Sequence, residues 1–304
     1  MRAGTVRTAM TLDQLRIFVA VAERQHVTRA AEALNLVQSA VSAAIAALEG
    51  RHAVKLFHRV GRGIELTGAG RLFLAEARAV LARAEAAEQV LADLSGLRRG
   101  TLTIRASQTI AGHWLPRHLV AFRAAYPDIV LRLGIGNTAQ AAEAVRSGVA
   151  ELGFVEGAVE DDGLASLPVA EDRLVLVVRP GHALAGCRQP GPSDLAAIAW
   201  VLREPGSGTR SALESAVAAS GLAPDALTVA LELPSNEAVL AAVAAGAGAS
   251  VLSEAVVAPS LRTGTLVAVP LGLPARTFRV LRHKERYRSR AADALLDLIR
   301  GAEP

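Results

Sequence analysis

The sequence predicts an α/β protein with an N-terminal winged helix-turn-helix, a long linker helix and a two-lobed α/β domain. Three observations carry this prediction. Residues 28–49 have the pattern of two short helices joined by a tight turn, a basic glycine-containing hairpin follows them, and strand and helix patterns alternate from residue 101 onwards. We expect domain boundaries at 10–67, 68–95 and 96–304, with one lobe over about 101–172 and 275–304 and the other over about 173–274.

Composition and charge restrict the classes of protein that fit this chain. Hydrophobic residues make up 51% of its 304 residues, enough to fill more than one core. The formal net charge of +4 resides in residues 1–67, which contain nine Lys or Arg and five Asp or Glu. A cationic segment of this kind is typical of contact with a DNA phosphate backbone. Cys187 is the only cysteine, so an intrachain disulfide and a cysteine cluster for zinc are excluded.

The N-terminal helices are predicted from periodicity and capping residues. Apolar residues recur at helical spacing over 12–22, which predicts a first helix with one buried face. Thr28 is a suitable N-cap for a second helix, in which Ala30 and Ala31 permit close packing. A third helix is expected over 38–49.

The third helix has two different faces. Its inward face is apolar and consists of Val41, Ile45 and Leu48. Its outward face consists of small residues, namely Ser39, Ser42, Ala43 and Ala46. Small side chains would let the helix lie deep in a DNA major groove, where Gln38 and Ser42 could form hydrogen bonds to bases or phosphates.

A basic hairpin over residues 57–67 is predicted to form the wing. Glycines permit its tight turn, and Phe57, Ile64 and Leu66 can bury one of its faces. Arg59 and Arg62 lie near the tip. We expect Arg59 to contact phosphate and Arg62 to contact phosphate or the minor groove.

These segments resemble the N-terminal domain of LysR-type transcriptional regulators. The resemblance rests on LDQLRIFVAVAE, TRAAEALN, QSAVSAAIAALE and LFHRVGRGIELTGAG. It implies a homo-oligomer, a dimer of dimers on double-stranded promoter DNA, with RNA polymerase as a further partner. The expected DNA-binding residues are Thr28, Gln38, Ser39, Ser42, Ala43, Arg59 and Arg62.

The chain departs from the family pattern at its third helix. Many relatives have Ser where this chain has Val37, and many have Arg or Gln where it has Ala43-Ala44. We therefore expect direct base contacts to be few, with more of the recognition coming from the wing and from DNA shape.

The linker helix is predicted over Gly68 to Leu94, with Thr67 as its cap. One narrow stripe of small and apolar residues runs along it, namely Leu72, Ala75, Ala79, Ala82 and Ala86. A second stripe contains Leu74, Leu81 and Leu91. Small residues at such a seam favour close helix pairing, and in the resembling family this helix pairs with its copy in a second subunit. Residues 97–100 are the expected hinge into the next domain.

The alternating pattern after residue 101 predicts parallel sheets covered by helices in two lobes. Residues 277–283 are expected to form a strand that returns to the first lobe, followed by a final helix over 289–301. Two lobes joined by two crossings correspond to the periplasmic-binding-protein-like effector domain of the resembling family. Ligands of such folds bind at the carboxyl ends of the strands, between the lobes.

Polar residues that follow these strands are the candidate effector site. The glycines of the 204–210 loop expose backbone N–H groups, and its hydroxyls precede a helix, which favours an anion. Arg210 could add a positive charge or only fix the loop through a salt bridge. The expected effector-binding residues are Ser107, Gln108, Thr109, Asn137, Thr138, Ser207, Gly208, Thr209, Arg210 and Asn236.

The segment REPGSGTR resembles one branch of the LysR-type family, which includes regulators of sulfur assimilation and carbon fixation. That resemblance implies a small anionic effector, either an inorganic oxyanion or a phosphorylated or carboxylated metabolite. No cofactor and no metal are expected.

Two other classes of protein remain as alternatives. A solute-binding receptor would suit the two-lobed domain, but the N-terminal helices argue against it. An enzyme would need a set of catalytic residues, and the chain contains no HExxH, GxSxG or P-loop motif and no GxGxxG motif after its first strand.

No apolar stretch has the length of a signal or membrane segment, so we expect a cytoplasmic protein. Residues 1–9 show no pattern, and Met10 is an alternative start.

Overall fold

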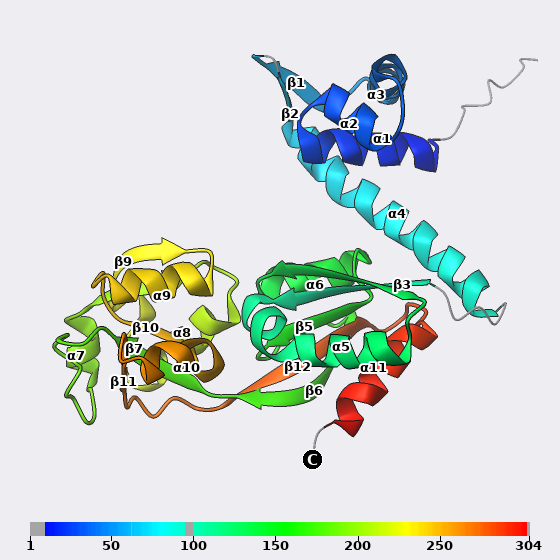
Figure 1. The fold of residues 1–304 in the computed structure, drawn as a ribbon. Coiled ribbons are helices and arrows are strands. Elements are labelled where there is room, and N and C mark those ends of the chain that lie inside the picture. Colours follow the sequence, from blue (N-terminus) through cyan, green and yellow to red (C-terminus); the bar gives the residue numbers. More distant parts are fainter. Residues whose placement is uncertain (1–9, 62, 95–99, 303–304) are drawn as a thin grey trace, which may run out of the picture. The chain divides into compact units, whose positions relative to one another are not determined.

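The computed structural model describes residues 10–61, 63–94 and 100–302. Residues 1–9, Arg62 and most of the predicted hinge lie outside the described residues. The chain divides into two compact units, one up to Gln89 with Ser147–Val149, the other with the rest of the chain from Val90. Each unit is described by itself (Figure 1).

The first unit contains the predicted winged helix-turn-helix and most of the long helix. Its elements are α1 (Leu12–Arg24), α2 (Val27–Ala33), α3 (Gln38–His52), β1 (Phe57–Val60), β2 (Gly63–Leu66) and α4 (Gly68–Leu94). Thr11 begins α1 with a reciprocal capping box to Gln14. Phe18 is fully buried, and its ring packs against those of Phe57 and Phe73, so that α1 holds the wing and α4 together.

The second helix begins earlier than expected. Thr28 was predicted to be its N-cap, but α2 starts at Val27 and the ring of His26 accepts the backbone N–H of Arg29. The prediction was wrong because His26 Nδ1 supplies the acceptor that was assigned to the threonine hydroxyl. The third helix begins at Gln38 as predicted, and it continues three residues beyond Glu49 to His52.

The long helix α4 begins at Gly68 with Thr67 as its cap, as predicted, because the hydroxyl of Thr67 accepts the backbone N–H of Gly70. Ala77 is buried, and Leu74 and Leu81 pack against the core formed by α1, α3 and the start of the wing. Leu72 and Leu91 are exposed on the helix. The second predicted stripe is therefore divided, since Leu74 and Leu81 pack within the unit whereas Leu91 is exposed.

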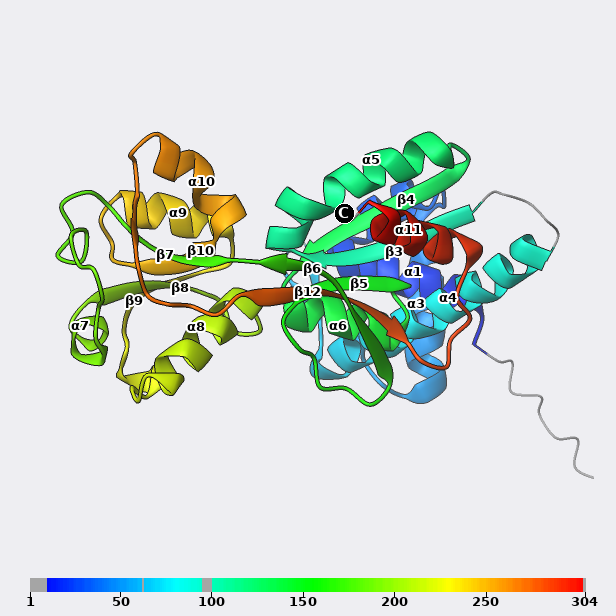
Figure 2. The ribbon, with the colours of Figure 1, turned by 90° about the horizontal axis from the view of Figure 1, so that it is seen from below.

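The first lobe of the second unit is a five-stranded sheet in the order β4-β3-β5-β12-β6. Its strands are β3 (Gly100–Ser107), β4 (Ile129–Gly136), β5 (Leu152–Glu156), β6 (Leu164–Asp172) and β12 (Arg276–His283). Its helices are α5 (Leu115–Ala125), which a π-helical turn (η1, Ile110–Trp114) precedes, α6 (Thr138–Ser147) and α11 (Arg290–Gly301). Helices α5 and α11 cover one face of the sheet, and α6 covers the other (Figure 2).

The second lobe contains a three-stranded sheet in the order β10-β7-β11 and the pair β8-β9. The strands are β7 (Leu174–Val178), β8 (Ala199–Arg203), β9 (Thr228–Leu233), β10 (Ser250–Ser253) and β11 (Val267–Val269). The helices are α7 (Pro192–Ala196), α8 (Gly208–Ala219), the 3₁₀ turn η2 (Pro224–Ala226), α9 (Asn236–Ala244) and α10 (Glu254–Arg262). A parallel bridge between Trp200 and Ala249 joins the two sets of strands.

Two chain crossings join the lobes, and they correct the prediction of parallel sheets. Strand β6 continues into β7, and β11 continues into β12, so the chain leaves the first lobe and returns to it along neighbouring paths (Figure 2). The two crossings run in opposite directions, and β12 is therefore antiparallel to β5 and β6, while β10 and β11 are antiparallel to β7. The predicted return of residues 277–283 to the first lobe is confirmed.

One glycine is needed for the second lobe to close. Gly248 has φ of +147°, and a Cβ atom there would lie 2.2 Å from the carbonyl oxygen of Ala199. The next residue, Ala249, exchanges backbone hydrogen bonds with Ala199 and Val201 of β8. A side chain at position 248 would therefore push β8 away from β10.

No single helix in the described ranges has the length and apolar character needed to cross a membrane. Helices α2 and α3 reach that length and apolar character only when they are taken together, and the chain bends by 111° between them.

Candidate functional site

The third helix presents its small residues to solvent. Gln38, Ser39, Ser42 and Ala43 are exposed, whereas Val41 and Leu48 are buried against α1 and α2. The α1–α2–α3 core is apolar and small, because Ala30 and Ala31 let α2 approach α3 closely. An exposed helix face without bulky side chains is what entry into a major groove requires.

The wing is fixed to the end of α3 by a buried carboxylate. Glu49 accepts hydrogen bonds from Lys55 Nζ at 2.6 Å, from the backbone of Leu56 at 2.8 Å and from that of Phe57 at 3.2 Å. Burial alone would raise the pKa of Glu49, but these donors outweigh it and lower the pKa below its ordinary value. Sequence reasoning missed Glu49, since nothing local to α3 shows that its partners lie on the wing.

Several cations of the first unit are available to an external anion. Arg16, Arg24 and Arg78 pair with Asp13 or Glu23. In the described part of the chain, Arg29, Arg51 and Arg59 are exposed and form no ion pair with a carboxylate.

Among the predicted contacts, Arg59 is therefore placed as expected, near the wing turn where Gly61 adopts φ of +58°. Thr28 is half-buried in the first turn of α2. Arg29 and Arg51 were not singled out from the sequence; Arg29 lies on the predicted second helix, and Arg51 lies in the part of α3 that extends beyond the predicted end at Glu49.

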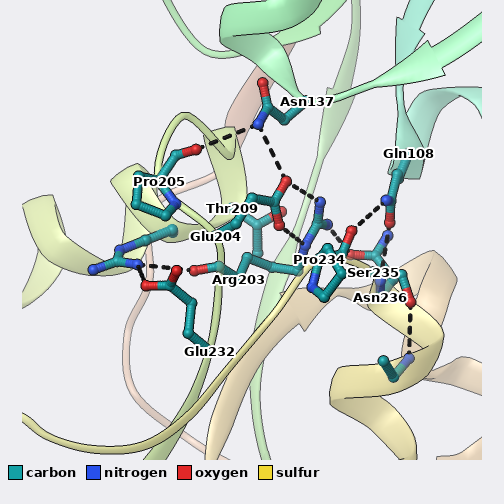
Figure 3. A network of polar contacts seen from close by, with 12 residues as sticks. Gln108, Asn137, Arg203, Glu204, Pro205, Thr209, Glu232, Pro234, Ser235 and Asn236 are labelled. Carbon is teal, nitrogen blue, oxygen red and sulfur yellow. Dashed lines mark hydrogen bonds and ion pairs between the residues drawn. The ribbon is translucent and has the colours of Figure 1, made fainter. Parts of the chain in front are cut away.

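In the second unit, the predicted effector residues lie where the lobes meet. Gln108 follows β3 of the first lobe, and its side chain donates to Pro234 O at 2.6 Å and accepts from the backbone N–H of Asn236 at 3.0 Å (Figure 3). The amide of Asn236 also donates to Thr109 Oγ1 at 3.3 Å. The segment after β3 is thus bonded to the N-terminus of α9.

A second contact joins the lobes at the loop after β8. Asn137 follows β4, and its Nδ2 donates to Glu204 Oε1 at 3.2 Å and to Pro205 O at 3.3 Å (Figure 3). Asn137 also exchanges hydrogen bonds with Gln140, which fixes the start of α6. The loop REPGSGT therefore lies directly against the N-terminus of a helix from the other lobe.

The glycines of that loop permit this close approach. A Cβ atom on Gly208 would lie 2.8 Å from Thr138 Oγ1 and 2.9 Å from Glu156 O. Gly206 has φ of +84° and accepts a backbone hydrogen bond from Ala139 through its carbonyl. Ser207 begins α8 without capping it through its side chain, and it is 3% exposed.

The side chain of Arg210 is held by carboxylates of its own lobe. It contacts Glu214 at 2.7 Å and Glu232 at 2.5 Å, and it donates to the carbonyl of Arg203. Of the two roles considered from the sequence, these contacts correspond to fixing the loop.

Sequence reasoning missed a buried ionic cluster at the two crossings. Arg276, at the start of β12, binds Asp172, at the end of β6, with Nε and Oδ2 2.7 Å apart. It also donates to Thr209 Oγ1 at 3.0 Å, and its Nη2 is 3.9 Å from Glu156 Oε1. Asp172 accepts a further bond of 2.6 Å from Ser253. The cluster connects both crossings to the N-terminus of α8.

The structure brings most of the predicted effector residues to one region between the lobes. Ser107 and Thr109 are buried after β3, and Thr138 donates to Glu156 at 3.0 Å. The hydroxyl of Ser107 is buried and has no hydrogen-bond partner. In the described residues, no group of three or more His, Cys, Asp or Glu is arranged to hold a metal ion.

Comparison with known families gives two matches along the chain. Residues 12–71 match the family of bacterial regulatory helix-turn-helix proteins of the lysR family, and residues 95–303 match the LysR substrate binding domain.

Curated relatives span almost the same length. An uncharacterized HTH-type transcriptional regulator, YeiE of Escherichia coli K12, is 36% identical over 293 residues, 95% of this chain and 96% of that protein. A probable RuBisCO transcriptional regulator of Nostoc is 32% identical and covers 93% of this chain and 86% of that protein.

Solved structures share the fold. Full-length CbnR, crystallised with its target DNA, superposes with a TM-score of 0.69 at 23% identity, covering 97% of this chain and all of that one. The regulatory domain of CcmR from Synechocystis, solved in complex with 2-PG, has a TM-score of 0.61 at 28% identity and covers 67% of this chain and 97% of that one. With a helix-turn-helix and a substrate-binding domain both matched, the chain belongs to the LysR family of bacterial transcriptional regulators.

Proposed function

We propose that this protein binds promoter DNA in the cytoplasm as a homo-oligomer, a dimer of dimers, and that a small anionic metabolite between its two lobes controls it. The observation that carries the DNA-binding part is the exposed small-residue face of α3 beside a wing that Glu49 fixes in place. RNA polymerase would be the further partner, whose activity at the promoter the bound protein would change. We propose no catalytic activity, and turnover of the bound metabolite by purified protein would contradict this.

The effector part is supported by the contacts between lobes. Gln108, Asn137 and Asn236 each form hydrogen bonds to the opposite lobe, so a ligand inserted there changes how the lobes meet. A ligand can shift such an equilibrium only through different affinities for the two arrangements. The complex of CcmR with 2-PG supports a phosphorylated carboxylate as the class. No other cofactor is proposed.

The DNA-binding part is tested by replacing Ser42 with glutamate. Ser42 is exposed on the outward face of α3, so the substitution leaves the core intact and places a carboxylate against phosphates and bases. Specific binding should be lost in a footprinting assay on the protein's own promoter, whereas Glu76→Gln on α4 should footprint normally. A normal footprint from Ser42→Glu would exclude α3 from the groove.

The effector part is tested by thermal shift with 2-phosphoglycolate, phosphate, sulfate, sulfite and short carboxylates. Binding to the folded state raises the melting temperature with ligand concentration. At least one of these anions should do so saturably at constant ionic strength. If none does, the cleft does not bind an effector of this class.

A further inference from the structure

A carboxylate of the protein itself is bound by a buried arginine where the two lobes meet. Arg203 is the last residue of β8, and its side chain is 3% exposed. Its guanidinium holds the next residue, Glu204, in a bidentate pair, with Nε 2.8 Å from Oε2 and Nη2 2.9 Å from Oε1 (Figure 3). This is the geometry by which arginine recognises carboxylate or phosphate ligands.

The same carboxylate also contacts the first lobe. Asn137 Nδ2 donates to Glu204 Oε1 at 3.2 Å, so donors from both lobes converge on one oxygen. The third guanidinium nitrogen of Arg203, Nη1, donates to Asn236 Oδ1 at 2.5 Å. Glu204 is thus bound as an external oxyanion would be, by one arginine and by one amide across the cleft.

The charge state of Glu204 agrees with this role. Burial alone would raise its pKa, but hydrogen bonds from Arg203 and Asn137 and the charge of Arg203 lower the pKa below its ordinary value. Glu204 is therefore an anion at neutral pH. Its side chain is 22% exposed, which leaves it a path to solvent.

The guanidinium groups of Arg203, Arg210 and Arg276 are each paired with a carboxylate. Arg276 is paired with Asp172, whose side chain is 6% exposed, and Arg210 is paired with two carboxylates of its own lobe. An oxyanion that pairs with Arg203 through both Nε and Nη2 must therefore displace the Glu204 carboxylate. Asp172 also contacts the opposite lobe, through Ser253, but its side chain is 6% exposed. Glu204 is 22% exposed and contacts the opposite lobe through Asn137.

We propose that Glu204 is a built-in competitor of the effector, and that the effector's oxyanion binds Arg203 and Asn137 by taking the place of the Glu204 carboxylate. The inference rests on the proposed effector function and deepens it by naming the position and the competing group. The ligand class is a carboxylate or phosphate group, since the Glu204 carboxylate that it replaces uses one oxygen for Arg203 Nε and the other for Arg203 Nη2 and the Asn137 amide.

Glu204→Ala tests the position without knowledge of the effector. The substitution leaves Arg203 with a free carboxylate-binding face, which acetate can fill. In the full-length chain, acetate should raise the melting temperature of Glu204→Ala saturably relative to chloride at equal ionic strength, and acetamide should not. The matched control is Glu254→Ala, which removes an exposed carboxylate 4.0 Å from Arg173 in the same lobe. Equal acetate responses in the two variants would overturn the proposal.

Glu204→Gln tests competition directly and also serves if the alanine variant does not fold. It keeps the shape of the side chain and removes its charge, so titration calorimetry with 2-phosphoglycolate should give a Kd about tenfold lower than in the wild type. If 2-phosphoglycolate binds both with equal Kd, the effector function stands and the competitor role fails. If acetate fills Glu204→Ala while no tested anion binds the wild type, the anion position stands and the effector proposal fails.

Discussion

Replacing Asp172 with alanine should destabilise the two-lobed unit by about 3 kcal/mol. Asp172 and Arg276 are each 6% exposed at the side chain, and removal of one partner from a buried pair costs about 3–5 kcal/mol because the other charge stays buried. Glu156, 3.9 Å from Arg276 Nη2, remains to offset part of that charge, which places the expected loss at the lower end of the range.

The two tryptophans provide the assay. Trp114 and Trp200 are the only tryptophans of the chain, and both are buried, one in each lobe. Urea unfolding followed by their fluorescence therefore reports on the two-lobed unit rather than on the DNA-binding unit. Asp297→Ala is the control, since Asp297 and Arg300 are 75% and 63% exposed and 3.6 Å apart, and we expect a change within about 0.5 kcal/mol.

A double substitution separates the buried charge from the lost contact. Asp172→Ala combined with Arg276→Met should be more stable than Asp172→Ala alone, because the unpaired cation is removed together with its partner. If Asp172→Ala stays within about 1 kcal/mol of the wild type, the pair at the crossings does not carry the stability argued here.

The remaining predictions concern single elements. Leu72→Glu on α4, where the leucine is 77% exposed, should raise the dimer dissociation constant at least about tenfold in sedimentation, because it places a charge in the expected helix seam; an unchanged constant would move the seam elsewhere. Glu49→Gln should destabilise the winged unit by about 1–3 kcal/mol at pH 7 in calorimetry. Since the pKa of Glu49 is lowered by folding from about 4.5, this difference should vanish as pH falls through its folded value, and a difference that persists in acid would refute the assignment. Gly248→Ala should cost at least about 2 kcal/mol by tryptophan fluorescence, and a neutral result would show that β8 can move away freely.

The sequence predicted elements that carry a clear local pattern. Helix α11 and strand β4 were found because their apolar periodicity and flanking residues agree. Strand β6 was missed because it contains Pro168, which is tolerated there since β6 lies at the edge of its sheet. Helix α7 has only five residues and shows no measurable period, and β8 beyond it was not assigned either.

The apolar residues of segment 249–257 favour a single strand, but β10 ends at Ser253 and helix α10 begins at Glu254. The signal that could have found it is Ser253, which accepts the backbone N–H of Ala255, followed by Glu254 in the first turn.

The residues of the candidate site also divide into those that a local sequence pattern predicted and those that only the fold brings together. Gln108 and Asn137 were predicted because they follow strands whose carboxyl ends face a cleft, and Asn236 because it begins a helix after β9. Asp172 and Arg276 are 104 residues apart in the chain, and no local pattern reveals their contact. Arg203 and Glu204 are adjacent, but only the fold shows that the charge of one satisfies the other.

The bond between Glu49 and the wing also limits how this protein can measure DNA. One carboxylate joins the last turns of α3 to the first strand of the wing. We therefore expect the helix and the hairpin to bind a duplex as one rigid body. The distance between a major-groove contact and the neighbouring wing contact is then set by the protein. A base pair inserted inside a half-site should abolish recognition. The effect of a base pair inserted between half-sites depends instead on how the paired subunits space their DNA-binding units.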